Sequence, residues 1–307
     1  MAEADIDAAA SVVYTSFRRI ADANNAFSFT ASSKGQSRNI VNSSWRNESG
    51  ITLVAASASD DAELLGFIAV QRMGTAWDLG PVAVSIDYQA RGVGRALVTA
   101  IIDQVERSRE QGSLIFLTVD TFNVGALALY CSCGFTVRAP VVVMELSRAV
   151  PPPNEQRSAD DQHVRLALPA DLADCAALSW ASAQVDLSQD VQKHLPHTRV
   201  LLSPSGELLG YCTRFDMSGH LIASTREAAQ ALLCAAESDD HLPSSSPAEE
   251  LGDLGPPRIC VPVQQQPELT RWMLARGWRC VKSLLLMTRG AYTLPPDTSG
   301  AVFFPQC

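Results

Sequence analysis

The sequence predicts an α/β (α+β) fold in which helices flank β-sheets in two domains. Two segments indicate the mixture of elements. Residues 93–105 place apolar side chains at helical spacing, and residues 114–119 form a continuous apolar run typical of a strand buried on both faces. A proline-rich and then polar stretch at 151–161 indicates a linker, and similar strand and helix patterns follow it. The chain has 307 residues, enough for two domains of ordinary size.

The composition is typical of a soluble globular protein, with 47% hydrophobic residues. A net charge of -9 argues against a nucleic-acid-binding surface and weakly favours cationic substrates such as amines. No apolar run approaches the length of a membrane span, and the acidic residues 1–5 lack a signal-peptide pattern. The eight cysteines include no Cys-x-x-Cys pair. We therefore expect a cytoplasmic protein that binds neither nucleic acid nor membrane.

The first part of the chain alternates helix and strand patterns. We expect a helix at 6–23, then a polar stretch at 24–44 that reads as a loop and a short helix. Strands are expected at 51–58, 64–73 and 75–85, the first two joined by a turn at 59–62. The last strand contains Gly80-Pro81. Because proline cannot donate a ladder hydrogen bond, this pair indicates a bulge or an unpaired edge strand.

Residues 79–96 read as a strand, a short turn and a glycine-bearing entry into a helix. The first N–H groups of a helix lack intrahelical partners, and the helix dipole adds positive charge there, so the turn suits a phosphate. A P-loop is excluded because its Lys-Ser/Thr is absent, and a dinucleotide-binding loop because position 97 is leucine. The motif that remains is Gln-x-x-Gly-x-Gly, formed by Gln89, Gly92 and Gly94.

A second motif follows one helix and one strand later: Asn-x-x-Ala-x-x-Leu-Tyr and then Gly-Phe, within residues 123–135. Together the two motifs resemble those of the Gcn5-related N-acetyltransferases, the GNAT superfamily, over roughly residues 1–148. The resemblance implies a mixed, mostly antiparallel sheet with flanking helices. Its central strand pair would splay at Gly80-Pro81, so that the pantetheine arm of acetyl-CoA enters the gap.

The resemblance also implies roles for individual residues. Backbone N–H groups near the strand end would polarise the thioester, amides of the glycine loop would hold the pyrophosphate, and an asparagine would bond the pantetheine amide. The residues implied to contact acetyl-CoA are Val82, Ala83, Val84, Gln89, Ala90, Arg91, Gly92, Val93, Gly94, Arg95, Ala96 and Asn123. Asn123 would also suit a helix N-cap, and the two roles can coexist; Arg91 and Arg95 would add positive charge, although Arg95 would equally be a solvated arginine at the helix start.

Tyr130 is implied to donate a proton to the leaving thiolate; the alternative is an aromatic side chain packed under the strands. The general base is not evident from the sequence. Asp78 and Asp120 are candidates, and each would also suit a strand-end or capping role. Residues 24–44 would cover the acceptor in such a fold, or form an ordinary surface loop.

The second half of the chain repeats the order of elements and resembles the degenerate half of tandem-domain acetyltransferases. Elements are expected at 163–168, 169–185, 199–202, 208–215, 220–223, 225–237, 259–263, 268–276 and 278–287. Aligning Gly277 with Gly134 puts Met273 at the tyrosine position and Gln266 at the asparagine position. No glycine follows the strand at 220–223. We therefore expect an acetyl-CoA-binding domain at 1–150, a linker at 151–161 and a degenerate GNAT-like domain at 162–307.

The function expected from these features is acetyl-CoA-dependent transfer of an acetyl group directly to an amine. The acceptor would be a small-molecule amine, a polyamine or a peptide amine. The alternative is a non-catalytic module that binds acyl-CoA or a partner. We expect no metal, since Pro196 interrupts the spacing of His194 and His197. The protein is expected to act as a monomer or a homodimer.

Overall fold

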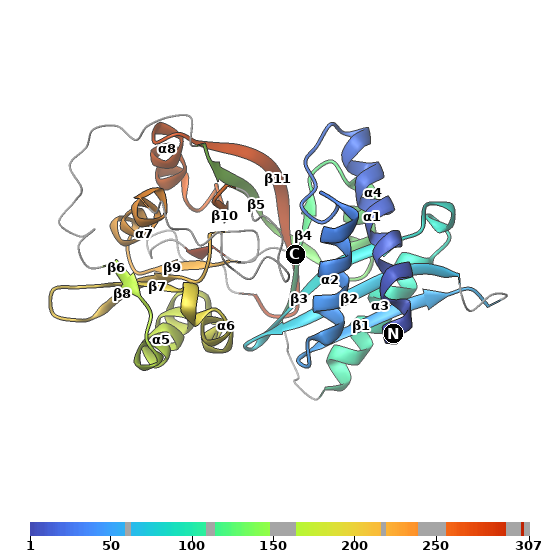
Figure 1. Ribbon diagram of the computed structural model, residues 1–307, viewed down its shortest axis with the longest axis horizontal. Coiled ribbons are helices and arrows are strands. Elements are labelled where there is room, and N and C mark those ends of the chain that lie inside the picture. Colours follow the sequence, from blue (N-terminus) through green and yellow to red (C-terminus); the bar gives the residue numbers. More distant parts are fainter. Residues whose placement is uncertain are drawn as a thin grey trace.

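The computed structural model describes residues 1–58, 63–108, 114–147, 164–215, 219–238, 256–292 and 302–303. The predicted turn at 59–62, the linker at 151–161 and residues 239–255 lie outside this part of the chain. The two halves of the chain meet at two long strands that run side by side, β5 (Thr136–Leu146) and β11 (Trp278–Arg289) (Figure 1).

The N-terminal half follows the predicted order of elements. Before β5 it comprises η1 (Glu3–Asp5), α1 (Ile6–Ala23), α2 (Lys34–Arg46), β1 (Gly50–Ala56), β2 (Leu64–Met73), β3 (Ala76–Val84), η2 (Ile86–Tyr88), α3 (Val93–Arg107), β4 (Leu114–Asp120) and α4 (Val124–Ser132). The predicted helix at 6–23 is confirmed, and the polar stretch at 24–44 forms a loop and α2.

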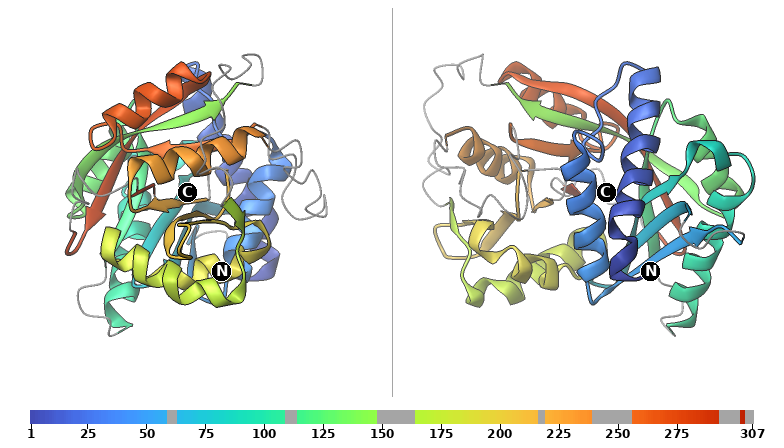
Figure 2. Two further views of the ribbon diagram at one scale, coloured as in Figure 1. Left: turned by 90° about the vertical axis from the view of Figure 1, so that its left-hand side faces the viewer. Right: turned by 45° about the vertical axis from the view of Figure 1, so that its right-hand side comes forward.

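Helices cover both faces of this part of the sheet because β2 is apolar on both sides. Phe67 and Ala69 pack with α1 and α2, whereas Ile68 and Val70 pack with α3. Figure 2 shows α1 and α2 side by side in front of the strands. We call the face under α3 and α4 the helix-α3 face, and the other the opposite face.

The C-terminal half also keeps the predicted order. Its elements before β11 are β6 (Val164–Leu166), η4 (Pro169–Asp171), α5 (Leu172–Ala183), α6 (Ser188–Lys193), η5 (Leu195–His197), β7 (Arg199–Leu202), β8 (Leu208–Cys212), β9 (Leu221–Ala223), α7 (Arg226–Ser238), β10 (Arg258–Val261) and α8 (Pro267–Ala275). The short helix α6 and the last strand, β12 (Val302–Phe303), were not predicted.

Strands of both halves alternate within one sheet. The order of the seven-stranded sheet is β1-β2-β3-β4-β11-β5-β10, so that β11 from the C-terminal half separates β4 from β5. β11 is antiparallel to both neighbours, and β5 in turn pairs with β10. The other C-terminal strands form a five-stranded sheet, β12-β9-β8-β7-β6. The two halves therefore share strands as well as a linker.

A hydrophobic core joins the halves on the opposite face of the large sheet. Ala76 and Phe116 of the N-terminal half pack in one cluster with Leu187, Val191 and Tyr211 of the C-terminal half. The β2–β3 turn also reaches across: a β-carbon placed on Gly74 would lie 1.4 Å from the carbonyl oxygen of Asp186. Only glycine fits this contact, so the halves are closely packed here.

Candidate active site

The two central strands of the N-terminal half separate in the middle of their length. β3 and β4 pair in parallel only from Ala76 with Leu114 to Asp78 with Phe116. Beyond these residues the described part of β3 pairs with β2 alone, and the described part of β4 pairs with β11. The predicted splay is therefore present, and it opens towards the C-terminal ends of both strands.

A bulge accompanies the splay. The register of β2 with β3 shifts between Ile68 and Val70, opposite Gly80-Pro81, and this peptide bond is cis. Leu79 and Val82 both pack on the helix-α3 face although three positions separate them. The bulge predicted from Gly80-Pro81 is thus confirmed, and it reverses the alternation of side chains in the last part of β3.

At the end of β3, the backbone N–H and C=O of successive residues point alternately towards β2 and towards the gap. The N–H of Ser85 donates to the carbonyl of Leu65 at 2.8 Å, so the N–H and C=O of Ala83, two residues earlier, also point towards β2. The N–H and C=O of Val82 and Val84 point towards the other edge, from which β4 has diverged. The carbonyl of Val84 accepts bonds there from Ser16 Oγ at 2.7 Å and Gln89 Nε2 at 3.0 Å. The N–H of Val82 is therefore directed into the gap.

The turn after β3 contains two residues in the left-handed region of the backbone. Ala90 and Gly92 have positive φ angles of 59° and 89°, and Gly92 is the N-cap of α3. The N–H of Ala96 donates to the carbonyl of Gly92 at 2.9 Å, so the N–H groups before Ala96 have no acceptor within the helix. A β-carbon on Gly92 would meet no atom within 4 Å, which leaves open space before the helix.

Two aromatic and charged contacts shape the same turn. The guanidinium of Arg91 lies 5.5 Å from the centre of the Tyr88 ring. Tyr88 donates a hydrogen bond to Glu63 at 2.9 Å, and this bond raises the pKa of Tyr88. Arg91 thus lies beside the loop, and Arg95 is exposed in the first turn of α3.

Gly94 brings the strand end, α3 and α4 together. A β-carbon at this position would lie 3.2 Å from Leu129 Cδ2 and 3.5 Å from Val84 Cγ2. A β-carbon at the second glycine of the motif would therefore crowd Leu129, whereas the first glycine adopts a positive φ angle. Asn123 caps α4 by accepting a hydrogen bond from the N–H of Ala126 at 3.1 Å, so the N-cap interpretation of Asn123 is confirmed.

Tyr130 lies in α4 on the helix-α3 face. Its side chain is 7% exposed, and its ring packs edge-to-face on Phe135 with the ring centres 5.9 Å apart. The aromatic packing expected as the alternative is therefore present. It also fixes the ring, so packing and a chemical role are compatible.

The two candidate bases project from the opposite face. Asp78 shares this face with Ala76, is 1% exposed and accepts a hydrogen bond from Gln71 Nε2 at 3.2 Å. Asp120 shares it with Phe116 at the end of β4. Lys282 of β11, which sequence analysis missed, places its Nζ 2.9 Å from Asp120 Oδ1. Both carboxylates thus lie across the sheet from Tyr130.

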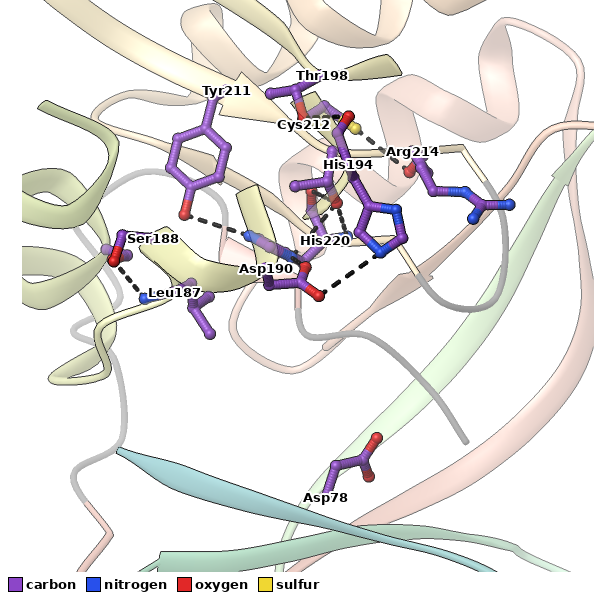
Figure 3. A network of polar contacts seen from close by, with 12 residues as sticks. Asp78, Leu187, Ser188, Asp190, His194, Thr198, Tyr211, Cys212, Arg214 and His220 are labelled. Atoms are coloured by element: carbon purple, nitrogen blue, oxygen red, sulfur yellow. Dashed lines mark hydrogen bonds and ion pairs between the residues drawn. The ribbon is translucent and has the colours of Figure 1, made fainter. Parts of the chain in front are cut away.

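A buried polar network of the C-terminal half faces Asp78 (Figure 3). Asp190 of α6 lies 3.1 Å from Nδ1 of the fully buried His220 and 3.6 Å from Nε2 of His194. His220 Nε2 contacts the hydroxyl of Tyr211 at 3.2 Å. Burial raises the pKa of Asp190, but the contact with His220 and the charges of His220, His194 and Lys193 together outweigh it, so the pKa lies below its ordinary value. No sequence spacing indicated this network.

The C-terminal half starts the corresponding helix differently. α7 begins after Thr225, whose Oγ1 accepts a hydrogen bond from the N–H of Ala228 at 3.1 Å. Its own side chain thus occupies one N–H group that a bound anion would use. In α8, Gln266 and Met273 hold the positions relative to Gly277 that Asn123 and Tyr130 hold relative to Gly134, and both glycines have positive φ.

Within the described residues, no three His, Cys, Asp or Glu side chains are grouped as metal ligands. No helix in the described part of the chain has the length and apolar character needed to cross a membrane.

Several known proteins are similar to this chain. The N-alpha-acetyltransferase RimI of Mycobacterium tuberculosis is 33% identical over 82 residues, which cover 25% of this chain and 49% of that protein. The [ribosomal protein bS18]-alanine N-acetyltransferase of Escherichia coli K12 is 43% identical over 54 residues, 18% of this chain and 35% of that protein. The matches thus span half or less of these curated relatives.

Solved structures share the fold over the whole chain. A putative acetyltransferase from Pyrococcus horikoshii superposes with a TM-score of 0.67 at 14% identity, covering 99% of this chain and 92% of that one. A GCN5-related N-acetyltransferase from Sphaerobacter thermophilus gives a TM-score of 0.58 at 16% identity, covering 97% of both chains. Residues 17–135 match the family model described as the acetyltransferase (GNAT) family. The N-terminal segment of this chain is therefore similar to the acetyltransferase (GNAT) family.

Proposed function

We propose that this protein is an acetyl-CoA-dependent N-acetyltransferase that transfers the acetyl group directly to an amine. The observation that supports this most is the opening between β3 and β4 beside the glycine start of α3. A phosphate-bearing thioester needs both features: N–H groups for its diphosphate and a path for its extended arm. The match of residues 17–135 to the acetyltransferase (GNAT) family model and the names of the curated relatives agree with this proposal.

The acetyl-CoA site would lie on the α3 side of the splay. The amides of residues 89–96 would hold the diphosphate, and open space before Gly92 leaves room for it. The N–H of Val82, directed into the gap, would donate to the thioester carbonyl and stabilise the charge that develops there. Asn123 would add a polar contact to the pantetheine arm without losing its N-cap bond.

The acceptor amine would approach from the opposite face, where Asp78 and Asp120 project. Its nitrogen would attack the thioester carbonyl, a carboxylate would take the proton that the nitrogen loses, and the carbon–sulfur bond would break. Tyr130 would protonate the departing thiolate from the α3 side. A phenol with a pKa of about 10 can protonate a thiolate of similar basicity without further tuning.

The two halves would have different roles in the reaction. Residues 1–150 would carry the acetyl-CoA site, and residues 162–307, beyond the linker at 151–161, would complete the sheet through β11 and cover the acceptor side. Thr225 closes the start of α7, so the second half would bind no acetyl-CoA of its own.

Release of the CoA thiol, measured against a panel of amines, tests the proposal. The panel should include a polyamine, a small monoamine and a peptide that begins with alanine. We expect thiol release that depends on the amine and saturates with acetyl-CoA. Binding of acetyl-CoA without release by any amine would instead support a non-catalytic binding module.

A further inference from the structure

An ion pair joins the two halves at the mouth of the splay. Lys282 of β11 lies 2.9 Å through Nζ from Asp120 Oδ1, and both side chains are largely buried, at 13% and 12% exposed. The contact is an ion pair rather than a hydrogen bond to Oδ1. Lys282 is contributed by a strand more than half the chain away from β4.

Asp120 stands opposite the strand position that would hold the thioester. The last paired residues are Asp78 and Phe116, and four positions further along their strands come Val82 and Asp120. The N–H of Val82 is directed into the gap, as described above. Asp120 thus lies at the open end of the splay, on the face from which an amine would enter.

β11 also holds the turn that follows Asp120. The N–H and Oγ1 of Thr121 both donate to the carbonyl of Ser283, at 3.2 Å and 3.3 Å. This turn leads directly to Asn123 and α4. The C-terminal half therefore fixes Asp120 from two sides, through backbone bonds and through Lys282.

Burial and Lys282 act on Asp120 in opposite directions. Burial raises the pKa of Asp120, and the charge and hydrogen-bonding capacity of Lys282 partly offset the rise. Asp78 projects from the same face, at the last position of β3 that pairs with β4. Without Lys282 the buried carboxylate of Asp120 would hold its proton to higher pH.

We propose that Lys282 is a positioning residue of the acetyl-transfer site, contributed by the C-terminal half, which keeps Asp120 ionised and oriented as the acceptor of the amine proton. This inference rests on the proposed function. One proton moves from the amine nitrogen to an Asp120 carboxylate oxygen as the nitrogen–carbon bond forms. Lys282 contacts neither substrate. A C-terminal half without its own acetyl-CoA loop would then still determine the activity of the N-terminal half.

A second ion pair between the halves provides a matched control. Arg289, on the same strand, pairs with Glu106 of α3 on the other face of the sheet, away from the splay. Lys282→Met and Arg289→Met each remove one β11 cation that pairs with a carboxylate of the N-terminal half. Only the first removes the partner of Asp120.

The experiment compares kcat/KM as a function of pH, together with acetyl-CoA affinity and Tm, for the full chain and these variants. Since general-base catalysis contributes ~10²–10⁴-fold, we expect Lys282→Met to lower kcat/KM at pH 7 by at least ~10-fold. The acid limb of the pH profile of this variant should move to higher pH, while its acetyl-CoA affinity should stay unchanged. Lys282→Arg should restore much of the loss, and Arg289→Met should leave the acid limb in place.

The variants also separate the possible failures. In an Asp120→Asn background, Lys282→Met should cause no further loss of kcat/KM. The double variant buries no unpaired charge, so it keeps the test valid if Lys282→Met alone folds poorly. A lower Tm with an unmoved acid limb and unchanged kcat/KM would leave Lys282 a purely structural residue and overturn the inference. Absence of thiol release by the unmodified protein would instead refute the proposed function, and the inference with it.

Discussion

Gly92 and Gly206 form a matched pair for testing the phosphate loop. Both have a φ angle of 89°, and a β-carbon placed on either would meet no atom within 4 Å. Gly206 lies in the β7–β8 turn, whereas Gly92 begins α3. A glutamate at either position must therefore adopt the same left-handed backbone conformation, and it adds the same charge.

The expected costs separate stability from binding. A non-glycine residue in the left-handed region costs roughly 1–2 kcal/mol, so Gly92→Glu and Gly206→Glu should lower the unfolding free energy by similar amounts. Only the glutamate at position 92 would face a diphosphate. Two unit charges about 4 Å apart repel by ~1 kcal/mol in water and ~4 kcal/mol near a protein surface. The Kd for acetyl-CoA should then rise by roughly 5-fold to 1,000-fold.

Denaturant unfolding and calorimetric titration with acetyl-CoA measure the two quantities. The expected result is equal destabilisation of the two variants and weakened binding in Gly92→Glu alone. Unchanged acetyl-CoA affinity in both variants would refute the assignment of the loop, and so would an equal loss of affinity in both.

Three further predictions follow from the fold and the site. Residues 1–150 expressed alone should show no cooperative thermal unfolding, because they lack Leu284, Leu286 and Met287 of β11, each worth ~1.5–3 kcal/mol against a total stability of ~5–15 kcal/mol; a sharp melting transition by circular dichroism would contradict this. Tyr130→Phe keeps the ring packed on Phe135, so turnover should fall ~10²-fold or more while acetyl-CoA affinity stays unchanged; normal turnover would remove the phenol from the mechanism. The lowered pKa of Asp190 means that its ionised form stabilises the fold above the unfolded value of about 3.9, and this stability is lost as the pH falls through the lower folded pKa. The difference in unfolding free energy between the unmodified protein and Asp190→Asn should therefore shrink as the pH falls below the unfolded pKa. A difference that does not change with pH would argue against the pair with His220.

Local patterns were sufficient to predict the elements that carry the proposed acetyl-CoA site. Helical spacing placed α1 and α3, and the turn between β3 and α3 was expected from its glycines. The proline at position 81 indicated a bulge because it cannot donate a ladder bond, and the register shift lies opposite it. Each of these features depends on residues close together in the chain.

The remaining features depend on partners far apart in the chain. The apolar pattern of residues 278–289 predicts a strand, but nothing in it says that β11 lies between β4 and β5. The pairing of Lys282 with Asp120 follows from that arrangement, whereas the pairing of His220 with Asp190 depends on the packing within the C-terminal half. The helix α6 has six residues, too few for a clear helical period, and it carries Asp190.

Amide chemical shifts followed during an acetyl-CoA titration of the isotope-labelled protein test the site most directly. The largest changes should fall on the N–H groups of residues 91–95 at the start of α3 and on Val82 at the splay. The N–H groups that begin α7, after Thr225, should not move. Changes centred on α7, or none at the start of α3, would contradict the account.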